Sequence, residues 1–254
     1  MISKTLRIAQ LIVLGLFALS SAAGATTCSN ASLSGTYGFL HNSTDSTGAP
    51  ASAAVSQLTF DSTKGTFTGE TTTSRDGVIA TESLTGTYSV ASNCTGTGNP
   101  TGGSPFSFVV TPTGFLALHL LSEGFAVKQA LPACTNAGAV GSFGLETTGV
   151  LIAGSSATAV AFIGELKLTV NSSGEGVISG HLAASENGTF LPFADEPVSG
   201  SYKVGTDCMG TAKIAPKGHS EMHFSFVVVD GGKEVLAVET DADTVVSGTM
   251  VRAD

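Results

Sequence analysis

The chain contains no tryptophan, and charged residues make up only 12% of its 254 positions, whereas 42% are hydrophobic. This composition excludes a disordered charged tail, which needs high net charge and few apolar residues. After the first residues, the sequence also lacks any long stretch with the 3.6-residue apolar period of an amphipathic helix. What remains are short apolar runs separated by Gly, Asn, Asp and Ser. This pattern predicts an all-β protein with many tight turns.

Basic residues are scarce as well, with 11 Lys and Arg against 20 Asp and Glu, for a net charge of −9. Nucleic acids and anionic membranes are bound through clustered Lys and Arg, so the charge balance argues against both as partners. The acidity is uneven. Residues 134–254 hold 14 acidic and 6 basic side chains, whereas residues 28–133 hold 6 and 3.

Familiar catalytic and cofactor motifs are also missing. We find no G-x-S-x-G elbow, no H-E-x-x-H zinc motif, no phosphate-binding Walker loop and no EF-hand in the sequence. The sequence therefore gives no catalytic residue and no cofactor to expect, and it favours a non-enzymatic role.

The amino terminus has the three parts of an export signal. Lys4 and Arg7 are followed by an apolar run over residues 11–19, and Ala23-Gly24-Ala25 matches an A-x-A cleavage site. The apolar run is shorter than the roughly 20 residues of a membrane-spanning helix. We therefore predict a signal peptide over residues 1–25, no membrane span in the mature chain, and a secreted or periplasmic location. The alanine-rich signal favours a Gram-negative bacterial source.

Two parts of the chain repeat one pattern. Residues 33–39 (LSGTYGF) correspond to residues 140–145 (VGSFGL), and residues 84–97 (LTGTYSVASNCTGT) correspond to residues 198–211 (VSGSYKVGTDCMGT). The run FSFVV at 106–110 recurs at 224–228 with the same letters. This duplication predicts two equivalent units, residues 26–133 and 134–254.

Each unit contains about eight strand candidates by alternation and turn signals. In the first unit they include 78–83 and 86–90 as two separate strands, and residues 96–103 are interpreted as a turn. Eight short antiparallel strands form a small up-and-down barrel or a β-sandwich. We predict two tandem barrels, since closure removes exposed strand edges. One sheet system shared by both copies is the other possibility.

The four cysteines occupy matching places, two in each unit. An even cysteine count in an exported protein implies disulfides. Of the three possible connectivities, one bridge within each unit agrees best with the duplication. We therefore predict Cys28–Cys94 and Cys134–Cys208.

Aromatic residues in the repeated segments are candidates for the barrel interior. An eight-stranded barrel is either filled by side chains or holds one small ligand. If it holds a ligand, the aromatic side chains expected to contact it are Tyr37, Phe39, Tyr88, Phe108, Phe143, Tyr202 and Phe226.

Some polar residues occur only in the second copy. His219, Glu221 and His223 alternate, so on a strand they would project from one face, where three such side chains could hold zinc. Their simpler interpretation is a solvated strand entrance, and we predict no metal site. Glu239, Asp241 and Asp243 also alternate, which suits either calcium or, more simply, a solvated turn. If the protein has a specific activity, these departures from the repeat point to the second copy.

The S-G-T-Y-G-F opening, the G-T-Y-x-V…C-T-G-T segment and the F-x-F-V-V strand resemble those of a group of exported, uncharacterised bacterial proteins. At the level of fold, the pattern resembles calycin-like barrels of the allene oxide cyclase and dirigent type. This resemblance implies a barrel isomerase or cyclase as the alternative function, although none of that group's functional residues maps onto this chain. The residues themselves favour non-enzymatic binding of a small apolar ligand or a partner surface.

Overall fold

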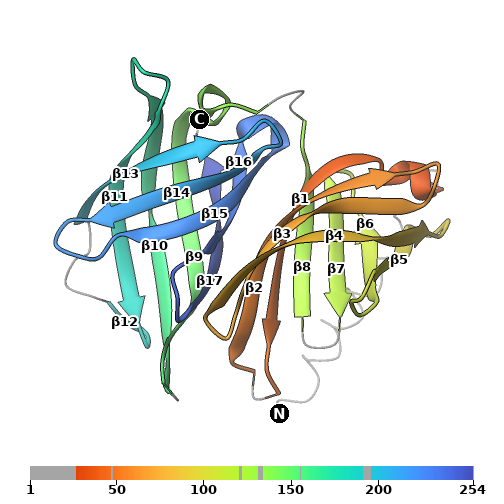
Figure 1. Ribbon diagram of the computed structural model, residues 1–254, viewed down its shortest axis with the longest axis horizontal. Coiled ribbons are helices and arrows are strands. Elements are labelled where there is room, and N and C mark those ends of the chain that lie inside the picture. Colours follow the sequence, from red (N-terminus) through yellow and green to blue (C-terminus); the bar gives the residue numbers. More distant parts are fainter. Residues whose placement is uncertain are drawn as a thin grey trace, which may run out of the picture.

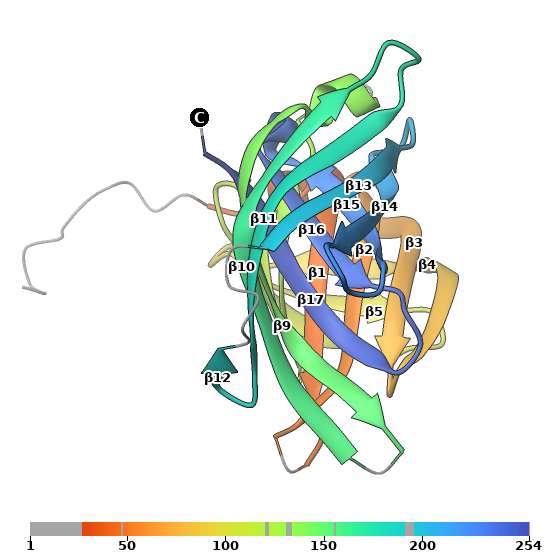
Figure 2. The same cartoon turned by 90° about the vertical axis from the view of Figure 1, so that its left-hand side faces the viewer.

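The computed structural model describes residues 27–253 apart from 47, 120–121, 131–133, 155 and 191–195, so the predicted signal peptide lies outside the described residues. Figure 1 shows two β-barrels side by side, and Figure 2 shows the same arrangement after a quarter turn. In the described part of the chain, no helix has the length and apolar character needed to cross a membrane.

The first barrel is formed by eight antiparallel strands in sequence order, and it closes where β1 pairs with β8. Its strands are β1 (Gly35–Thr44), β2 (Pro50–Asp61), β3 (Thr66–Arg75), β4 (Val78–Val90), β5 (Thr95–Pro100), β6 (Phe106–Val110), β7 (Gly114–His119) and β8 (Ser122–Lys128).

The second barrel also has eight strands and closes through two pairings, β17 with β9 and β10 with β11. Its strands are β9 (Gly141–Ala153), β10 (Ser156–Val170), β11 (Gly176–Glu186), β13 (Glu196–Val204), β14 (Met209–Pro216), β15 (Met222–Val229), β16 (Glu234–Glu239) and β17 (Thr244–Arg252). A short strand, β12 (Thr189–Phe190), extends β11.

The prediction of two tandem barrels is confirmed, and the sandwich and the shared sheet are both wrong. Among the described strands, none of the first barrel pairs with one of the second. Two details of the strand assignment were also wrong. Residues 78–90 form the single strand β4, and the glycine-rich segment predicted as a turn contains β5. Gly96 and Gly98 are tolerated in β5 because the rings of Phe108 and Phe106 lie over them, where a Cβ atom would clash.

Both predicted disulfides are present, Cys28–Cys94 and Cys134–Cys208. Each joins the segment before a short 3₁₀ helix to the turn that follows the strand carrying the repeated tyrosine. These helices are η1 (Asn30–Ser32) and η2 (Asn136–Ala139), and a third, η3 (Asp230–Gly232), follows β15. Cys94 and Cys208 both have a positive φ, of 68° and 73°. The duplication therefore extends to backbone conformation.

The repeated tyrosine holds the 3₁₀ helix against the end of its barrel. The Tyr88 hydroxyl donates to the backbone oxygen of Leu33 at 2.7 Å, and the Tyr202 hydroxyl donates to that of Asn136 at 2.8 Å. Burial raises the pKa of Tyr88 to about 12, so the phenol keeps the proton that it donates. In each barrel an asparagine of the same helix also caps the strand end, with Asn30 Oδ1 accepting from the Val90 N–H at 2.8 Å.

Replacing Tyr88 or Tyr202 with phenylalanine is expected to lower the free energy of unfolding by about 1–2 kcal/mol in each case, because each change leaves a backbone oxygen without its donor, buried at Leu33 and partly buried at Asn136. Urea denaturation of both variants checks this expectation. Equal stability of the Tyr88→Phe variant and the parent chain would show that the hydroxyl is dispensable.

The two barrels pack through their outer faces rather than end to end. β1, β2 and β3 of the first barrel lie against β15, β16 and β17 of the second (Figure 1). Gly38 is at the closest approach, since a Cβ atom there would lie 2.4 Å from Val229 and 2.6 Å from Val227. A shared apolar cluster fills the contact and includes Leu40, Ala53, Val55, Val150, Met209, Val227, Val229, Leu236, Val238 and Val245.

Candidate functional site

The first barrel is hollow at one end. A cavity of about 590 Å³ opens at the end that carries the β3–β4 turn, opposite the end covered by η1. Ligand sites in proteins commonly have volumes of about 300–1,000 Å³. The side chains around this cavity include Phe39, His41, Ser43, Ser52, Ala54, Ser56, Thr71, Thr73, Arg75, Asp76, Leu84, Ser104, Phe106, Ala117 and Ser122.

The hollow exists because small residues point inward at this level of the barrel. Strand pairing makes Ala54 of β2 the equivalent of Phe162 in β10, and Thr71 of β3 the equivalent of Leu182 in β11. At the inward positions where the first barrel has small side chains and a cavity, the second barrel thus has bulky side chains. The same registers match Ser52 with Val160 and Ser122 with Val246. Ser104 precedes the FSFVV repeat by two residues, as Met222 does in the second copy.

The other half of the first barrel is packed with aromatic rings. Phe115 lies near the centre of this cluster, with ring centroids 5.4 Å from Phe108 and 5.5 Å from Phe39. The Phe60 ring meets that of Tyr88 edge to face at 5.0 Å. Because aromatic pairs of this geometry are rigid and apolar, they give the cavity a firm apolar floor.

Hydroxyl groups line one wall of the cavity in cross-strand pairs. Ser43 and Ser52 are 2.6 Å apart through their Oγ atoms, and the Ser56 hydroxyl donates to Thr71 Oγ1 at 2.8 Å. A hydroxyl that donates one hydrogen bond still has lone pairs to offer. The wall can therefore bind polar groups of a ligand while its own hydroxyls remain paired.

The rim carries the charged residues of the site, and the second barrel supports it. Arg75 and Asp76 stand at the β3–β4 turn and are exposed. The backbone oxygen of Gly77 in this turn accepts from the Asp243 N–H at 3.0 Å, and the Ser74 hydroxyl donates to the backbone oxygen of Thr244. The turn that joins β16 to β17 thus fixes one side of the cavity mouth.

Of the seven aromatic residues predicted to contact a ligand, the structure places only Phe39 on the cavity wall. Tyr37, Tyr88 and Phe108 belong to the packed floor beneath it. Phe143, Tyr202 and Phe226 lie in the packed core of the second barrel.

Sequence reasoning missed the small residues of β2 and β3 as well as His41 and Arg75. The two copies agree at glycine, aromatic and cysteine positions, and the signal for the cavity is a small residue in one copy at the position of a large residue in the other.

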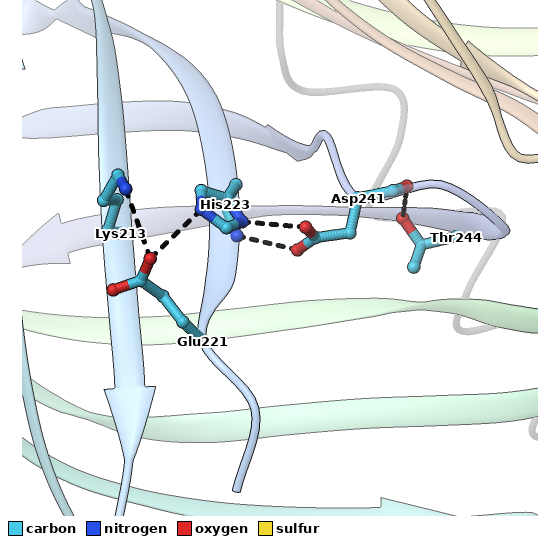
Figure 3. Close-up of polar contacts among 5 residues, drawn as sticks. All are labelled: Lys213, Glu221, His223, Asp241 and Thr244. Carbon is cyan, nitrogen blue, oxygen red and sulfur yellow. Dashed lines mark hydrogen bonds and ion pairs between the residues drawn. The ribbon is translucent and has the colours of Figure 1, made fainter.

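Three of the polar residues that distinguish the second copy, Glu221, His223 and Asp241, form a chain of contacts on its outer surface (Figure 3). His223 Nδ1 lies 2.8 Å from Asp241 Oδ1, and its Nε2 lies 3.1 Å from Glu221 Oε1. Lys213 Nζ continues the chain, 3.2 Å from the same Glu221 oxygen, while Thr244 donates to the backbone oxygen of Asp241. These groups are partly exposed, so each ion pair contributes little to stability.

In the part of the chain that is described, no three His, Cys, Asp or Glu side chains are grouped so as to hold a metal ion. His219 lies in the turn after β14, where its backbone N–H donates to Pro216. The calcium alternative also finds no support, since Asp241 faces His223, the Asp243 backbone bonds to Gly77, and Glu239 lies inside the second barrel.

Glu239 is a carboxyl buried among apolar side chains. It lies on β16 opposite Phe224, alternates with the core residues Val235 and Ala237, and is 4% exposed. Its Oε2 makes no hydrogen bond with any described residue. Burial, reinforced by the nearby Asp241 carboxylate, raises the pKa of Glu239 to about 7. This carboxyl is therefore a source of pH dependence in the second barrel.

A second hollow, of about 1,140 Å³, is an open groove along β10 and β11. Its sides carry Ile163, Glu165 and Lys167. Gly164 and Gly180 lie at its bottom, where an added Cβ atom would clash with the backbone of the neighbouring strand. Its lining combines these outer residues with Leu145, Leu182 and Val198, which belong to the core of the second barrel.

No protein-family model matches the chain, and no curated protein matches it in sequence.

Proposed function

We propose that this protein is an exported, non-enzymatic binding protein whose first barrel holds one small amphipathic molecule. The observation that carries the proposal is the cavity itself, because the second barrel has the same strand order and is filled by larger side chains at the equivalent level. A closed barrel gains stability when such a space is filled. The two disulfides suit an oxidising compartment, which supports export.

The lining indicates the chemistry of the ligand. An apolar body, preferably flat, would lie over Phe39, Leu84 and Phe106, in the volume that Phe162 and Met222 occupy in the second barrel. Its polar group would face the hydroxyl wall, and an anionic group would be attracted to Arg75 at the rim.

Binding is favoured over a barrel isomerase or cyclase by the exposure of the ionisable groups. General acid–base catalysis of that kind relies on buried groups with perturbed proton affinity. In this cavity His41 is only partly buried, and Arg75 and Asp76 are exposed. Among the described residues, the carboxyls with raised pKa are the partly buried Glu234 and the buried Glu239, and both belong to the second barrel.

The test uses 8-anilinonaphthalene-1-sulfonate, a flat aromatic anion that fluoresces in apolar sites, titrated into the mature chain. The double variant Ala54→Phe/Ser104→Met gives the first barrel side chains like those of the second. We expect it to weaken dye binding at least about tenfold, the equivalent of about 1.4 kcal/mol. Thr71→Leu is a milder change of the same kind, and Arg75→Gln should weaken binding of the anion without closing the cavity.

Ala159→Phe provides the control, because Ala159 is an exposed residue on the second barrel. Circular dichroism establishes that each variant is folded. Dye affinity that is unchanged in both Thr71→Leu and the double variant would place the dye elsewhere and remove the proposal.

A further inference from the structure

An apolar row runs around the outside of the first barrel. Strand pairing sets Val109 beside Leu116, Leu116 beside Phe125, Phe125 beside Leu40, and Leu40 beside Val55. The Leu40 and Val55 end is buried against the second barrel, and Phe125 packs at the edge of that contact. The other end is open, with Leu116 55% and Val109 47% exposed. One continuous row is therefore half covered.

The equivalent row of the second barrel is covered at its opposite end. It runs from Val227 through Leu236, Thr249 and Glu146 to Ile163. Val227 and Leu236 are fully buried against the first barrel, whereas Ile163 is 54% exposed. By the repeat, Val227 and Leu236 correspond to Val109 and Leu116 of the first barrel.

The contact between the barrels is thus heterologous, because the two repeats use different faces. We name the face that carries Val227 and Leu236 the donor face, and the face with Gly38 and Val55 the acceptor face. A heterologous contact leaves one face of each kind unused. The unused donor face contains Val109 and Leu116 on the first barrel, and the unused acceptor face belongs to the second.

The unused acceptor face has the features that the donor face needs. Gly38, over which Val227 and Val229 pack, corresponds to Gly144, where the nearest atom to an added Cβ is 3.9 Å away. Val55 corresponds to Ile163, which lines the open groove on β10 and β11. The position is therefore not covered by any described residue, and its apolar Ile163 shares the face with the charged Glu165 and Lys167.

We propose that copies of this chain associate head to tail, with the donor face of one copy (Val109 and Leu116) seated on the acceptor face of the next (Gly144 and Ile163). The contact repeats between molecules the geometry that joins the barrels within one molecule. It is weaker than the internal contact because Glu146 stands where the first barrel has Leu40. The chain also carries a net charge of −9, so added salt strengthens the association by screening repulsion.

Sedimentation velocity of the mature chain, from micromolar to near-millimolar concentration and at low and high salt, tests the proposal. We expect the weight-average mass to rise with protein concentration and with salt concentration. Leu116→Asp blocks the donor face and Gly144→Trp blocks the acceptor face, so each variant alone should remain monomeric. Mixed together they retain one working pair of faces and should form a dimer and nothing larger. Glu146→Leu should tighten the association at least about tenfold.

Val78→Asp is the matched control, since Val78 is an exposed apolar residue outside the row. A chain that stays monomeric under every condition would overturn the proposal. So would a Gly144→Trp variant that associates like the parent, because that result indicates a symmetric contact through the apolar patch alone.

Discussion

Replacing Cys28 and Cys94 with alanine is expected to lower the free energy of unfolding of the first barrel by about 4 kcal/mol. The bridge closes a loop of 66 residues, and in the chain-entropy model a loop of that size restricts the unfolded chain by about this amount. It also tethers η1 to the turn after β4, where Asn30 and Leu33 accept hydrogen bonds from β4. Urea denaturation of the double variant measures the loss.

The matched variant Cys134→Ala/Cys208→Ala should cost nearly as much, because its loop of 74 residues is similar in length. The cavity of the first barrel lies at the opposite end from its bridge, so dye affinity should persist in folded Cys28→Ala/Cys94→Ala protein. A loss of stability under about 1 kcal/mol would show that the bridge adds little to the strand pairing. Intact masses with and without reduction verify which bridges are present.

Replacing Glu239 with glutamine is expected to stabilise the protein by about 3 kcal/mol above pH 8 and to have little effect near pH 4. The pKa of Glu239 is raised from 4.5 to about 7 in the folded chain. The native state therefore binds more protons than the unfolded state between these values, and stability falls as pH rises through that window. Each unit of pKa shift corresponds to about 1.4 kcal/mol.

Urea denaturation of both chains from pH 4 to pH 9 tests this expectation. Between pH 4.5 and pH 8, the free energy of unfolding should fall much less in the Glu239→Gln variant than in the parent chain. Glu146→Gln serves as the control, because Glu146 is an exposed glutamate on the outer face of β9. The same pH dependence in Glu239→Gln and the parent chain would mean that other groups cause it.

The two barrels illustrate how one scaffold can be packed or hollow. Their strand order, tyrosine contacts and disulfides agree, and these features depend on backbone geometry. The exchange of Phe162 for Ala54 leaves hydrogen bonding along the strands unchanged but removes an aromatic side chain from the interior. A cavity can therefore arise in one copy without disturbing the fold.

The barrels, their duplication and both disulfides were predictable because each leaves a local or countable signal. Turn residues and alternation mark strands, and matched cysteines within a repeat indicate their partners. The candidate site was predicted less well, with one of seven aromatic residues on the cavity wall. The polar residues around His223 pointed to the second copy, whereas the cavity lies in the first barrel.

By itself, the sequence determined the all-β class, the two units and the pairing of the cysteines. Tertiary structure decided which barrel is hollow, because a cavity depends on the side chains that eight strands bring to one level, and that level is set by register. It also decided that Glu239 is buried and that Leu40 is covered while Leu116 is exposed. These outcomes depend on which outer faces of the two barrels meet, and the alternation within a strand is the same whichever faces are chosen.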